Sequence, residues 1–419
     1  MHMTDTDMAG AHQAGADVPR KDLPGMDGGG GTTDVLQDLI AAVRDARATG
    51  MRVHIRGGGS KARLLGQTGG STTGSANERS TAGGDVRPSL RRLDLSRHRG
   101  VVAYEPSELV FTARAGTSLV EAEALLAEQG QAFPFEPPAF GAGATLGGMV
   151  ACGWSGPARP WGGAVRDALL GVQMINGMGQ CLRFGGQVMK NVAGYDLARL
   201  QAGAFGRLGA LVEVSIKVLP HPACSRTRIL ELDRDAALTR VLALQRSAEP
   251  VTATVHLDGC LHVRFQGNEA AVTAAAARCG GSEPDAAAAS AFWASMREHT
   301  HRFYASSHDQ AASDDGEVWR LSLPHAAAFP AFEGTWCTEW AGAQRWLRAP
   351  TGTTLAAARV FAAAVTAGGH AERWSPVRAR PASHGIRGEL ERRLIEAFDP
   401  DGLFAPPSGG DAPAESGGS

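Results

Sequence analysis

Between Phe133 and Pro220 the chain alternates glycine-rich and apolar segments almost without a break. The stretch contains EPPAFGAGATLGG, GPARPWGGAVRDALLG, GGQVMKNVAGYDLARL and GRLGALVEVSIKVLP. Glycine has no side chain to pack and loses more entropy on folding than other residues, so a core gains little from it. It is favoured where the backbone must come close to another group. The pattern therefore predicts loops that surround a large ligand with main chain.

A second glycine cluster, Gly57-Gly58-Gly59-Ser60-Lys61, follows a predicted strand at 51–56. Consecutive glycines let successive backbone N–H groups point into one concavity, which suits a phosphate. The Walker A pattern is not met, because its spacing is absent and the serine precedes the lysine. On these residues alone, a plain glycine turn explains the cluster equally well.

Residues 141–148, GAGATLGG, imitate a dinucleotide-binding fingerprint, but the third glycine comes one residue late. The preceding PFEPP cannot be a central parallel strand, because proline donates no hydrogen bond to a sheet. These two departures argue against a nicotinamide dinucleotide. A glycine-lined approach to a pyrophosphate, with Thr145 donating at the start of a short helix, remains open.

Lysine is scarce in this chain. Of the 41 basic residues only Lys21, Lys61, Lys190 and Lys217 are lysines, and the last three lie in glycine-rich or apolar motifs. An ammonium is a compact point charge and a guanidinium is a wide planar fork, so a confined site can demand the former. The distribution indicates a local constraint at these positions without fixing a role.

Composition excludes several classes of function. A net charge of −2 leaves no electrostatic footprint for nucleic acid or anionic lipid. Six cysteines with no close pair exclude a CxxC-type iron–sulfur or zinc cluster and give no disulfide framework, which favours a reduced, cytoplasmic compartment. No window approaches the roughly 18 apolar residues of a membrane span. Residues 1–32 are polar and glycine-rich and are expected to be a disordered tail rather than a signal peptide.

The hydrophobic pattern predicts a mixed helix and strand chain in two domains. The first domain ends near residue 222 and contains a flexible, low-complexity insertion at 66–89; the second follows to residue 405, with a loose tail at 406–419. Ser118 and Glu121 form a capping box at the start of a helix. The expected elements are a helix at 34–49, strands at 51–56, 90–116 and 208–219, a helix from 118 to before 130, a hairpin at 169–184 around Asn176-Gly177, and a helix from about 390.

Two pairs of histidines invite a metal interpretation. His256 and His262 flank Asp258-Gly259, which predicts a two-residue hairpin turn. In that register residue 256 faces 261, so the two imidazoles project to opposite faces of the sheet and cannot share an ion. His299 and His301 are expected to be surface residues. No metal site is predicted.

Taken together, GGGSK, EPPAFGAGATLGG, GPARPWGGAVRDALLG and GGQVMKNVAGYDLARLQAGAFGRLG resemble the FAD-binding E subunits of bacterial glycolate oxidase. Those proteins belong to the flavoproteins with a PCMH-type FAD domain, also called the vanillyl-alcohol-oxidase type. The resemblance is dense over 33–222, thin over 223–395, and returns at FDPDGLF, where Ala405-Pro406 stand in place of the family's Asn-Pro. It implies an α+β fold, with a PCMH-type FAD-binding domain of two subdomains (33–222) and a smaller α/β cap domain (223–405).

The resemblance also implies four backbone segments around FAD: the pyrophosphate loop, a segment along the phosphates and ribityl chain, a segment at the flavin, and a glycine segment in which Arg207 replaces threonine. The first loop has no His or Cys for a covalent bond and Cys152 is a weak candidate, so non-covalent FAD is implied. Lys190 and Tyr195 are the weak candidates for orienting flavin or substrate, against an equally good structural role. The implied cofactor residues are Ile55, Arg56, Gly57, Gly58, Gly59, Ser60, Lys61, Ala139, Phe140, Gly141, Ala142, Gly143, Ala144, Thr145, Leu146, Gly147, Gly148, Cys152, Gly153, Trp154, Ser155, Phe205, Gly206, Arg207, Leu208, Gly209, Ala210 and Leu211.

The function implied is that of an FAD-binding subunit of a glycolate oxidase complex. It would oxidise glycolate to glyoxylate by hydride transfer to flavin, beside a catalytic flavoprotein subunit and an iron–sulfur subunit, and would reach the inner face of the plasma membrane only through these partners. The catalytic relatives carry a motif close to His-x-His-x-Gly-Asp-Gly-Asn, whereas residues 256–262 read HLDGCLH. Two alternatives stay open: a self-sufficient FAD-dependent D-2-hydroxy-acid dehydrogenase, and a mainly structural subunit whose FAD is not essential.

Overall fold

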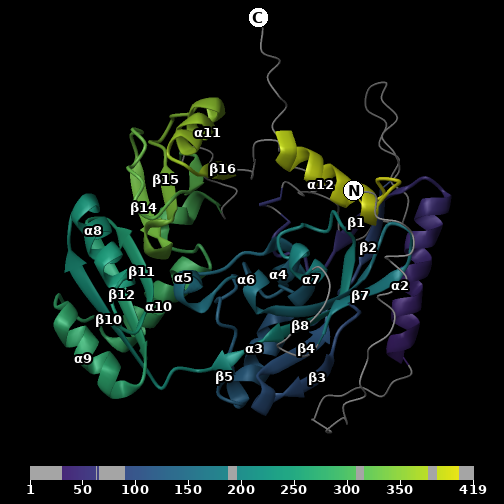
Figure 1. Cartoon of the computed structure of the whole chain (residues 1–419), viewed down its shortest axis with the longest axis horizontal. Helices are drawn as coiled ribbons and strands as arrows, with labels where there is room; N and C mark the ends of the chain where they lie inside the picture. The colour runs from purple at the N-terminus through teal and green to yellow at the C-terminus, as the bar shows by residue number, and fades with distance from the viewer. Residues whose placement is uncertain are drawn as a thin grey trace, which may run out of the picture.

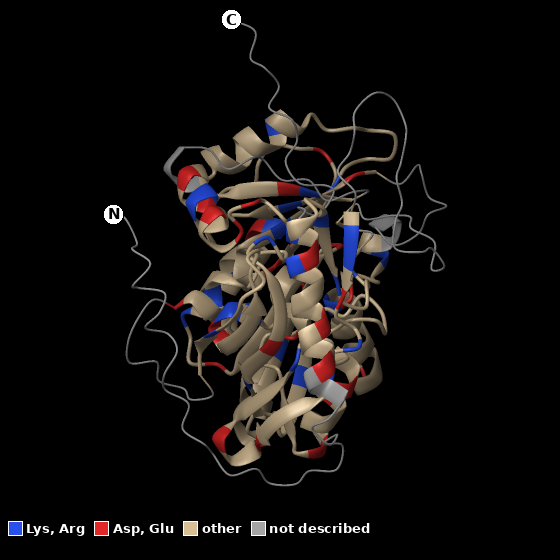
Figure 2. Ribbon diagram, turned by 90° about the vertical axis from the view of Figure 1, so that its right-hand side faces the viewer, with Lys and Arg blue, Asp and Glu red and all other residues tan. Residues whose placement is uncertain are grey.

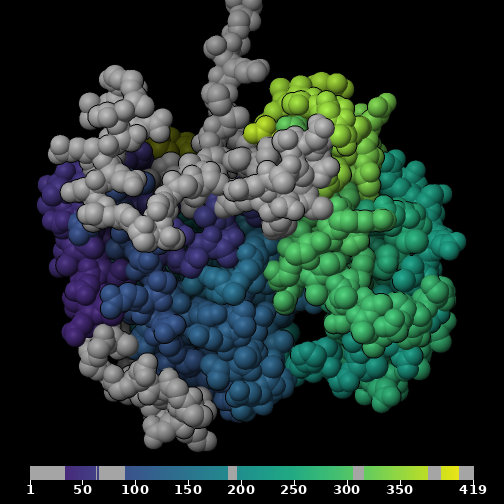
Figure 3. Space-filling model, turned by 180° about the vertical axis from the view of Figure 1, so that it is seen from behind, coloured from purple at the N-terminus to yellow at the C-terminus, as the bar shows by residue number. Residues whose placement is uncertain are grey.

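Two lobes, each built on its own antiparallel sheet, lie side by side in the computed structural model (Figure 1). The structure describes residues 31–62, 64–65, 90–186, 196–307, 316–375 and 385–404. The predicted tails and the predicted insertion at 66–89 lie outside these residues, apart from the first turn of the N-terminal helix. Seen from behind, the lobes meet in the middle of the view and are separated by an opening below that contact (Figure 3).

The first lobe begins with a small subdomain, α2 (Gly31–Ala48) on the parallel pair β1 (Arg52–Arg56) and β2 (Leu90–Asp94). Apolar residues at helical spacing, among them Leu39, Ile40 and Val43, are buried against Val53 and Leu93, as the pattern predicts. Acidic and basic residues are interspersed along α2 and the elements around it (Figure 2), in keeping with the small net charge.

The second subdomain of the first lobe is a five-stranded antiparallel sheet in the order β3-β4-β8-β6-β7. Its strands are β3 (Val101–Glu105), β4 (Val110–Arg114), β6 (Leu169–Ile175), β7 (Cys181–Gly185) and β8 (Ala210–Lys217). Helices and short elements accompany it: η2 (Pro106–Glu108), α3 (Leu119–Glu128), α4 (Leu146–Cys152), α6 (Val165–Ala168), α7 (Leu197–Leu200) and the pair β5 (Gln131–Ala132) with β9 (Leu219–Pro220). The short helix α5 (Arg159–Gly162) packs instead against the second lobe. The predicted hairpin is β6–β7, and Ser118 caps α3 by accepting from the N–H of Glu121.

The second lobe is built on a seven-stranded antiparallel sheet in the order β10-β12-β11-β14-β15-β13-β16. The strands are β10 (Cys224–Glu231), β11 (Val251–Leu257), β12 (Cys260–Gly267), β13 (Val318–Ser322), β14 (Thr335–Glu339), β15 (Gln344–Arg348) and β16 (His370–Ser375). The remaining elements are α8 (Arg234–Gln245), α9 (Glu269–Cys279), α10 (Ala286–Arg297), η3 (Arg302–Ser307), η4 (Trp340–Gly342) and α11 (Ala357–Thr366).

The β11–β12 hairpin has the predicted register, with His256 opposite Leu261 and Val255 opposite His262. The two histidines consequently point to opposite faces. His256 Nε2 lies 2.9 Å from the carbonyl oxygen of Leu232, and the His262 ring stacks on Phe292 with centroids 4.0 Å apart. They cannot share one ion, and no group of three metal-ligating side chains occurs in the described part of the chain.

The C-terminal segment departs from the prediction that all of 223–405 forms the cap domain. Helix α12 (Gly385–Phe398) packs Phe398 into the core of the first lobe, where Leu394 and Ile395 also lie. The carboxylate of Asp399 accepts the N–H groups of Leu403 and Phe404 at 2.8 Å, and the N–H of Val53 donates to the carbonyl of Leu403 at 2.7 Å. The FDPDGLF motif therefore anchors the chain end beside β1 in the first lobe.

A buried histidine in the first lobe gives a prediction about acid stability. His98 is only 5% exposed, and burial together with the charge of Arg114 lowers its pKa to about 4. Since an unfolded histidine titrates near 6.5, the unfolded chain binds more protons below that pH, and stability falls as the pH drops from about 6.5 towards 4. We expect this residue to cost about 2 kcal/mol of unfolding free energy at pH 5 relative to pH 7.

The measurement is the melting temperature of the wild type and of His98→Asn across this pH range. The variant should show a shallower loss of stability towards pH 5. His221→Asn, at an exposed position, should keep the wild-type slope. An unchanged slope in His98→Asn would contradict the assignment.

Candidate functional site

A cleft runs through the first lobe between its two subdomains and encloses about 830 Å³, its open mouth included. The loop that leaves β1 forms one wall, and α4 with the loop before it forms the other. Residues between 205 and 211, which follow α7, complete the lining. The lining residues are Ile55, Arg56, Gly57, Gly58, Gly59, Ser60, Lys61, Ala62, Leu65, Leu95, Ala115, Gly143, Thr145, Gly147, Gly148, Ala151, Cys152, Phe205, Gly206, Gly209 and Leu211.

Several of the glycines are required by contacts between protein segments. A Cβ added at Gly58 would overlap the carbonyl oxygen of Gly143, far inside the 3.0 Å that real Cβ atoms keep. A Cβ at Gly143 would lie 2.8 Å from the carbonyl oxygen of Gly58, and one at Gly147 would lie 2.7 Å from the Cβ of Ala115. The two glycine loops thus touch backbone to backbone. This contact brings main chain from both subdomains to the same point of the cleft.

The glycine loop offers a row of backbone donors. None of the N–H groups of residues 57 to 61 donates to a protein acceptor among the hydrogen bonds of the described residues, although Ala62 N–H closes the turn onto the carbonyl of Gly59 at 3.1 Å. Successive backbone N–H groups suit an anion such as a phosphate when they point into one concavity. The backbone donors fit the pyrophosphate of a dinucleotide, and Arg56 and Lys61 are cationic residues of the lining, so the cleft as a whole suits an anionic ligand.

Thr145 has a different hydrogen bond from the one expected. Its hydroxyl oxygen accepts the N–H of Gly148 at 3.2 Å and so caps α4. A hydroxyl can still donate its own hydrogen while it accepts one, so the predicted contact of Thr145 with a phosphate remains compatible with this capping role.

The predicted cofactor residues divide into two groups in the structure. Those that line the cleft are Ile55, Arg56, Gly57, Gly58, Gly59, Ser60, Lys61, Gly143, Thr145, Gly147, Gly148, Cys152, Phe205, Gly206, Gly209 and Leu211. Those outside its lining are Ala139, Phe140, Gly141, Ala142, Ala144, Leu146, Gly153, Trp154, Ser155, Arg207, Leu208 and Ala210. Lys190 and Tyr195 lie outside the described residues.

Five lining residues were not predicted: Ala62, Leu65, Leu95, Ala115 and Ala151. They are small or apolar residues that lie beside the glycine motifs or directly after a strand. Ala115 directly follows β4 and Leu95 directly follows β2, so each lies at a strand end that faces the cleft. Periodicity marks such residues as core, and only the pairing of the strands shows that they border a ligand site.

Arg207, which replaces a threonine of the family pattern, has a structural partner. Its guanidinium forms an ion pair of 2.5 Å with Glu391 of α12. The arginine therefore ties the loop beside the cleft to the C-terminal helix, and it does not line the cleft.

One end of the cleft abuts the second lobe through an aromatic cluster. Trp154 lies 6.2 Å from Phe205 and 4.9 Å from Trp374 of β16 between ring centroids, and Trp346 of β15 lies 5.2 Å from Trp374. Cys152 and Leu65 belong to the same buried group. The cleft thus has a cap end, where these aromatic rings meet.

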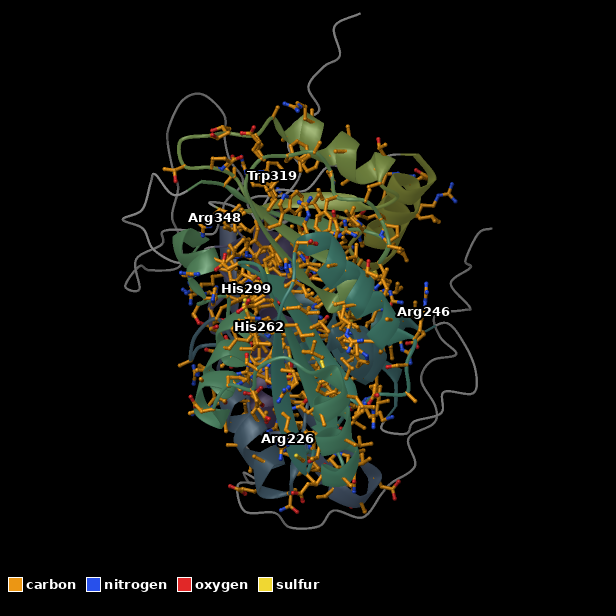
Figure 4. All side chains as sticks on the ribbon, turned by 90° about the vertical axis from the view of Figure 1, so that its left-hand side faces the viewer. Arg226, Arg246, His262, His299, Trp319 and Arg348 are labelled. Atoms are coloured by element: carbon orange, nitrogen blue, oxygen red, sulfur yellow. The ribbon has the colours of Figure 1, made fainter. Side chains whose placement is uncertain are left out.

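The expectation that His299 is a surface residue is wrong. Its side chain is 8% exposed and stacks on Tyr304 at 4.4 Å, close to Trp346 and Phe140. Figure 4 shows it in the interior of the second lobe together with His262, whereas Arg246 projects outward. The missed signal is the aromatic content of the segments that surround it.

Ion pairs and hydrogen bonds join the lobes beside the cleft. Arg264 of β12 pairs with Glu136 at 2.7 Å, and the indole N–H of Trp340 donates to the carbonyl of Gly156 at 3.0 Å. The carboxylate of Glu298 accepts the backbone N–H groups of Ala139 and Phe140 in the first lobe. These contacts fix the cap end of the cleft against the second lobe.

Comparison with known proteins first defines the class to which this protein belongs. Residues 35–185 match the FAD binding domain family, and the chain is a flavoprotein oxidoreductase with a PCMH-type FAD domain. The solved structure of alkyldihydroxyacetonephosphate synthase aligns with a TM-score of 0.58 at 14% identity, over 88% of this chain and 74% of that one. At this identity the match speaks for the fold alone. The predicted fold class and FAD cofactor are confirmed.

The particular family follows from a close relative. Over 321 residues the chain is 42% identical to glycolate oxidase subunit GlcE of Escherichia coli K12, covering 75% of this chain and 85% of that protein. The chain belongs to the family of glycolate oxidase subunit GlcE. Glycolate oxidase subunit GlcD of Bacillus subtilis is 26% identical over 37% of this chain and 33% of its own length. The mitochondrial D-lactate dehydrogenase [cytochrome] of Arabidopsis thaliana is 30% identical over 31% and 22%.

Proposed function

We propose that this chain is the FAD-binding subunit of a multi-subunit enzyme that oxidises glycolate to glyoxylate, and that its flavin passes electrons to other subunits. The 42% identity to a glycolate oxidase subunit over 85% of that protein carries the proposal. The partners are a GlcD-type flavoprotein subunit and an iron–sulfur subunit. A cytoplasmic location, with membrane contact only through these partners, belongs to the same proposal. No helix in the described ranges is long and apolar enough to cross a membrane.

When bound, FAD supplies the acceptor for the hydride that leaves Cα of the hydroxy acid. This chain's residues bind and orient it non-covalently. The backbone N–H groups of residues 57–61 would hold the pyrophosphate, the close contact of Gly58 with Gly143 would set the width of the cleft, and the aromatic cluster would cover its cap end.

The β11–β12 hairpin favours an electron-transferring subunit over a self-sufficient dehydrogenase. Residues 256–262 read HLDGCLH, where the catalytic relatives carry a motif close to His-x-His-x-Gly-Asp-Gly-Asn. His256 lies opposite Leu261 and Val255 lies opposite His262, so the two imidazoles point to opposite faces of the sheet and cannot act together on one substrate.

The test is the visible spectrum of the purified full-length chain, recorded anaerobically before and after addition of glycolate, alone and with the partner subunits. We expect a flavin spectrum that stays oxidised with glycolate alone and bleaches once the partners are present. Bleaching by glycolate without partners would show a self-sufficient dehydrogenase. A complex that keeps full activity with a flavin-free variant of this chain would show a mainly structural subunit.

A further inference from the structure

The lining of the cleft borders two unlike parts of the molecule. Leu95, Ala115 and Leu211 belong to the cores of the first lobe. Cys152 belongs to the aromatic cluster at the cap end, and the ammonium of Lys61 lies 5.6 Å from the ring of Phe140, which packs against that cluster. FAD carries its pyrophosphate between an adenosine half and a riboflavin half, so a pyrophosphate on residues 57–61 sends the two halves towards opposite ends. Reactive sites form preferentially where domains meet, which assigns the flavin ring to the cap end.

Lys61 is the cation at that end. Its side chain lines the cleft but is only 6% exposed. The ammonium donates to the carbonyl of Ala139 at 3.2 Å and lies 5.6 Å from the ring centre of Phe140. Burial lowers the pKa of this ammonium, while the charges of Cys152 and Glu298 act to raise it. No carboxylate of the described residues forms a salt bridge with Lys61.

A carboxylate of the second lobe binds the peptide segment of the first lobe to which Lys61 donates. One carboxylate oxygen of Glu298, directly after α10, accepts the N–H of Ala139 at 3.0 Å and that of Phe140 at 2.8 Å. Phe140 has a left-handed backbone with φ of 53°, a conformation that costs a non-glycine residue about 1 to 2 kcal/mol and needs support from its surroundings. One peptide segment therefore joins Lys61 on the cleft side to Glu298 on the cap side.

We propose that Lys61 faces the flavin ring and stabilises the negative charge that the ring gains on reduction, and that Glu298 positions Lys61 through the backbone of Ala139. The inference rests on FAD binding in this cleft, which is part of the proposed function. The rarity of lysine in an arginine-rich chain fits it, since a compact ammonium suits an enclosed site beside Gly57–Gly59 better than a guanidinium does.

The experiment uses the full chain reconstituted with FAD, and it measures the FAD dissociation constant and the midpoint potential by equilibration with a reference dye. In Lys61→Met we expect the affinity for reduced FAD to fall at least tenfold more than that for oxidised FAD, which lowers the potential by about 30 mV for a two-electron couple. Glu298→Gln retains an amide oxygen to accept both N–H groups but removes a negative charge near Lys61, so the potential should rise. Lys217→Met, the same change at a lysine outside the cleft lining, should match the wild type.

An electrostatic role of Lys61 requires that Lys61→Met lowers the midpoint potential and that Glu298→Gln raises it. If both variants weaken FAD binding without moving the potential, or if neither changes either quantity, the inference is overturned while FAD binding in the cleft stands. If Lys61→Met does not fold, Glu298→Gln still decides, because an unchanged or lowered potential in that variant overturns the proposal. Failure of the wild-type chain to bind FAD would instead remove the proposed function.

Discussion

Replacing Gly58 by alanine should abolish tight FAD binding and destabilise the first lobe more than any other single methyl group at the site. The added Cβ would overlap the carbonyl oxygen of Gly143, and both partners are main chain, so no side chain can rotate away. Overpacking a well-packed contact costs roughly 1 to 3 kcal/mol and occasionally more. We expect a loss at the upper end of that range and a rise in the FAD dissociation constant of at least about tenfold.

Thermal melting measures the loss of stability, and titration of the apoprotein with FAD measures the dissociation constant. Gly143→Ala is the milder companion, because its Cβ would lie 2.8 Å from the carbonyl oxygen of Gly58. It should fold and bind FAD more weakly than the wild type. Gly50→Ala is the control: its φ is +66° but no atom lies within 4 Å of the added Cβ, so it should lose about 1 to 2 kcal/mol of stability and keep its FAD affinity. Normal FAD affinity in Gly58→Ala would contradict the assignment of the cleft.

The glycines show how far sequence reasoning can reach. Their density correctly predicts that backbone approaches something closely near residues 57–61 and 141–148. The sequence cannot tell that Gly58 is needed against Gly143, from the other subdomain, rather than against the cofactor itself. Close approach to another protein segment and close approach to a cofactor both select glycine. The two can be told apart only when the structure shows which distant segments lie together.

Local signals give the elements, and long-range packing decides where they go. Ser118 and the Asp258-Gly259 turn specify a helix start and a strand register through neighbouring residues alone. The segment 385–404 also has a helical pattern, but its attachment to the first lobe depends on Asp399 reaching Leu403 and Phe404 beside β1. His299 is buried for the same kind of reason, since residues 304, 346 and 374 gather around it only after the second sheet forms.

Replacing Arg264 by methionine should weaken the junction between the lobes. The guanidinium is nearly buried and forms a 2.7 Å ion pair with Glu136 across the junction, donates to Thr252 at 3.0 Å, and lies over the ring of Trp293. Removal of one partner leaves the other charge poorly compensated in a largely buried place, which costs about 3 to 5 kcal/mol. We expect a lower melting temperature and faster cleavage in limited proteolysis, because the interface that holds the cap end of the cleft is loosened.

A double variant shows whether the loss comes from the pair. If the cost arises from stranding Glu136, adding Glu136→Gln to Arg264→Met should restore part of the melting temperature, since the amide can still accept the N–H of Ala158 that Glu136 now accepts at 3.0 Å. Arg278→Met is the matched control. It breaks a 2.8 Å pair with Glu249 on the surface of the same lobe, where solvent screens the charges, and should leave the melting temperature unchanged. If Arg264→Met also leaves the melting temperature unchanged, the ion pair between the lobes contributes nothing measurable and apolar contacts hold the junction.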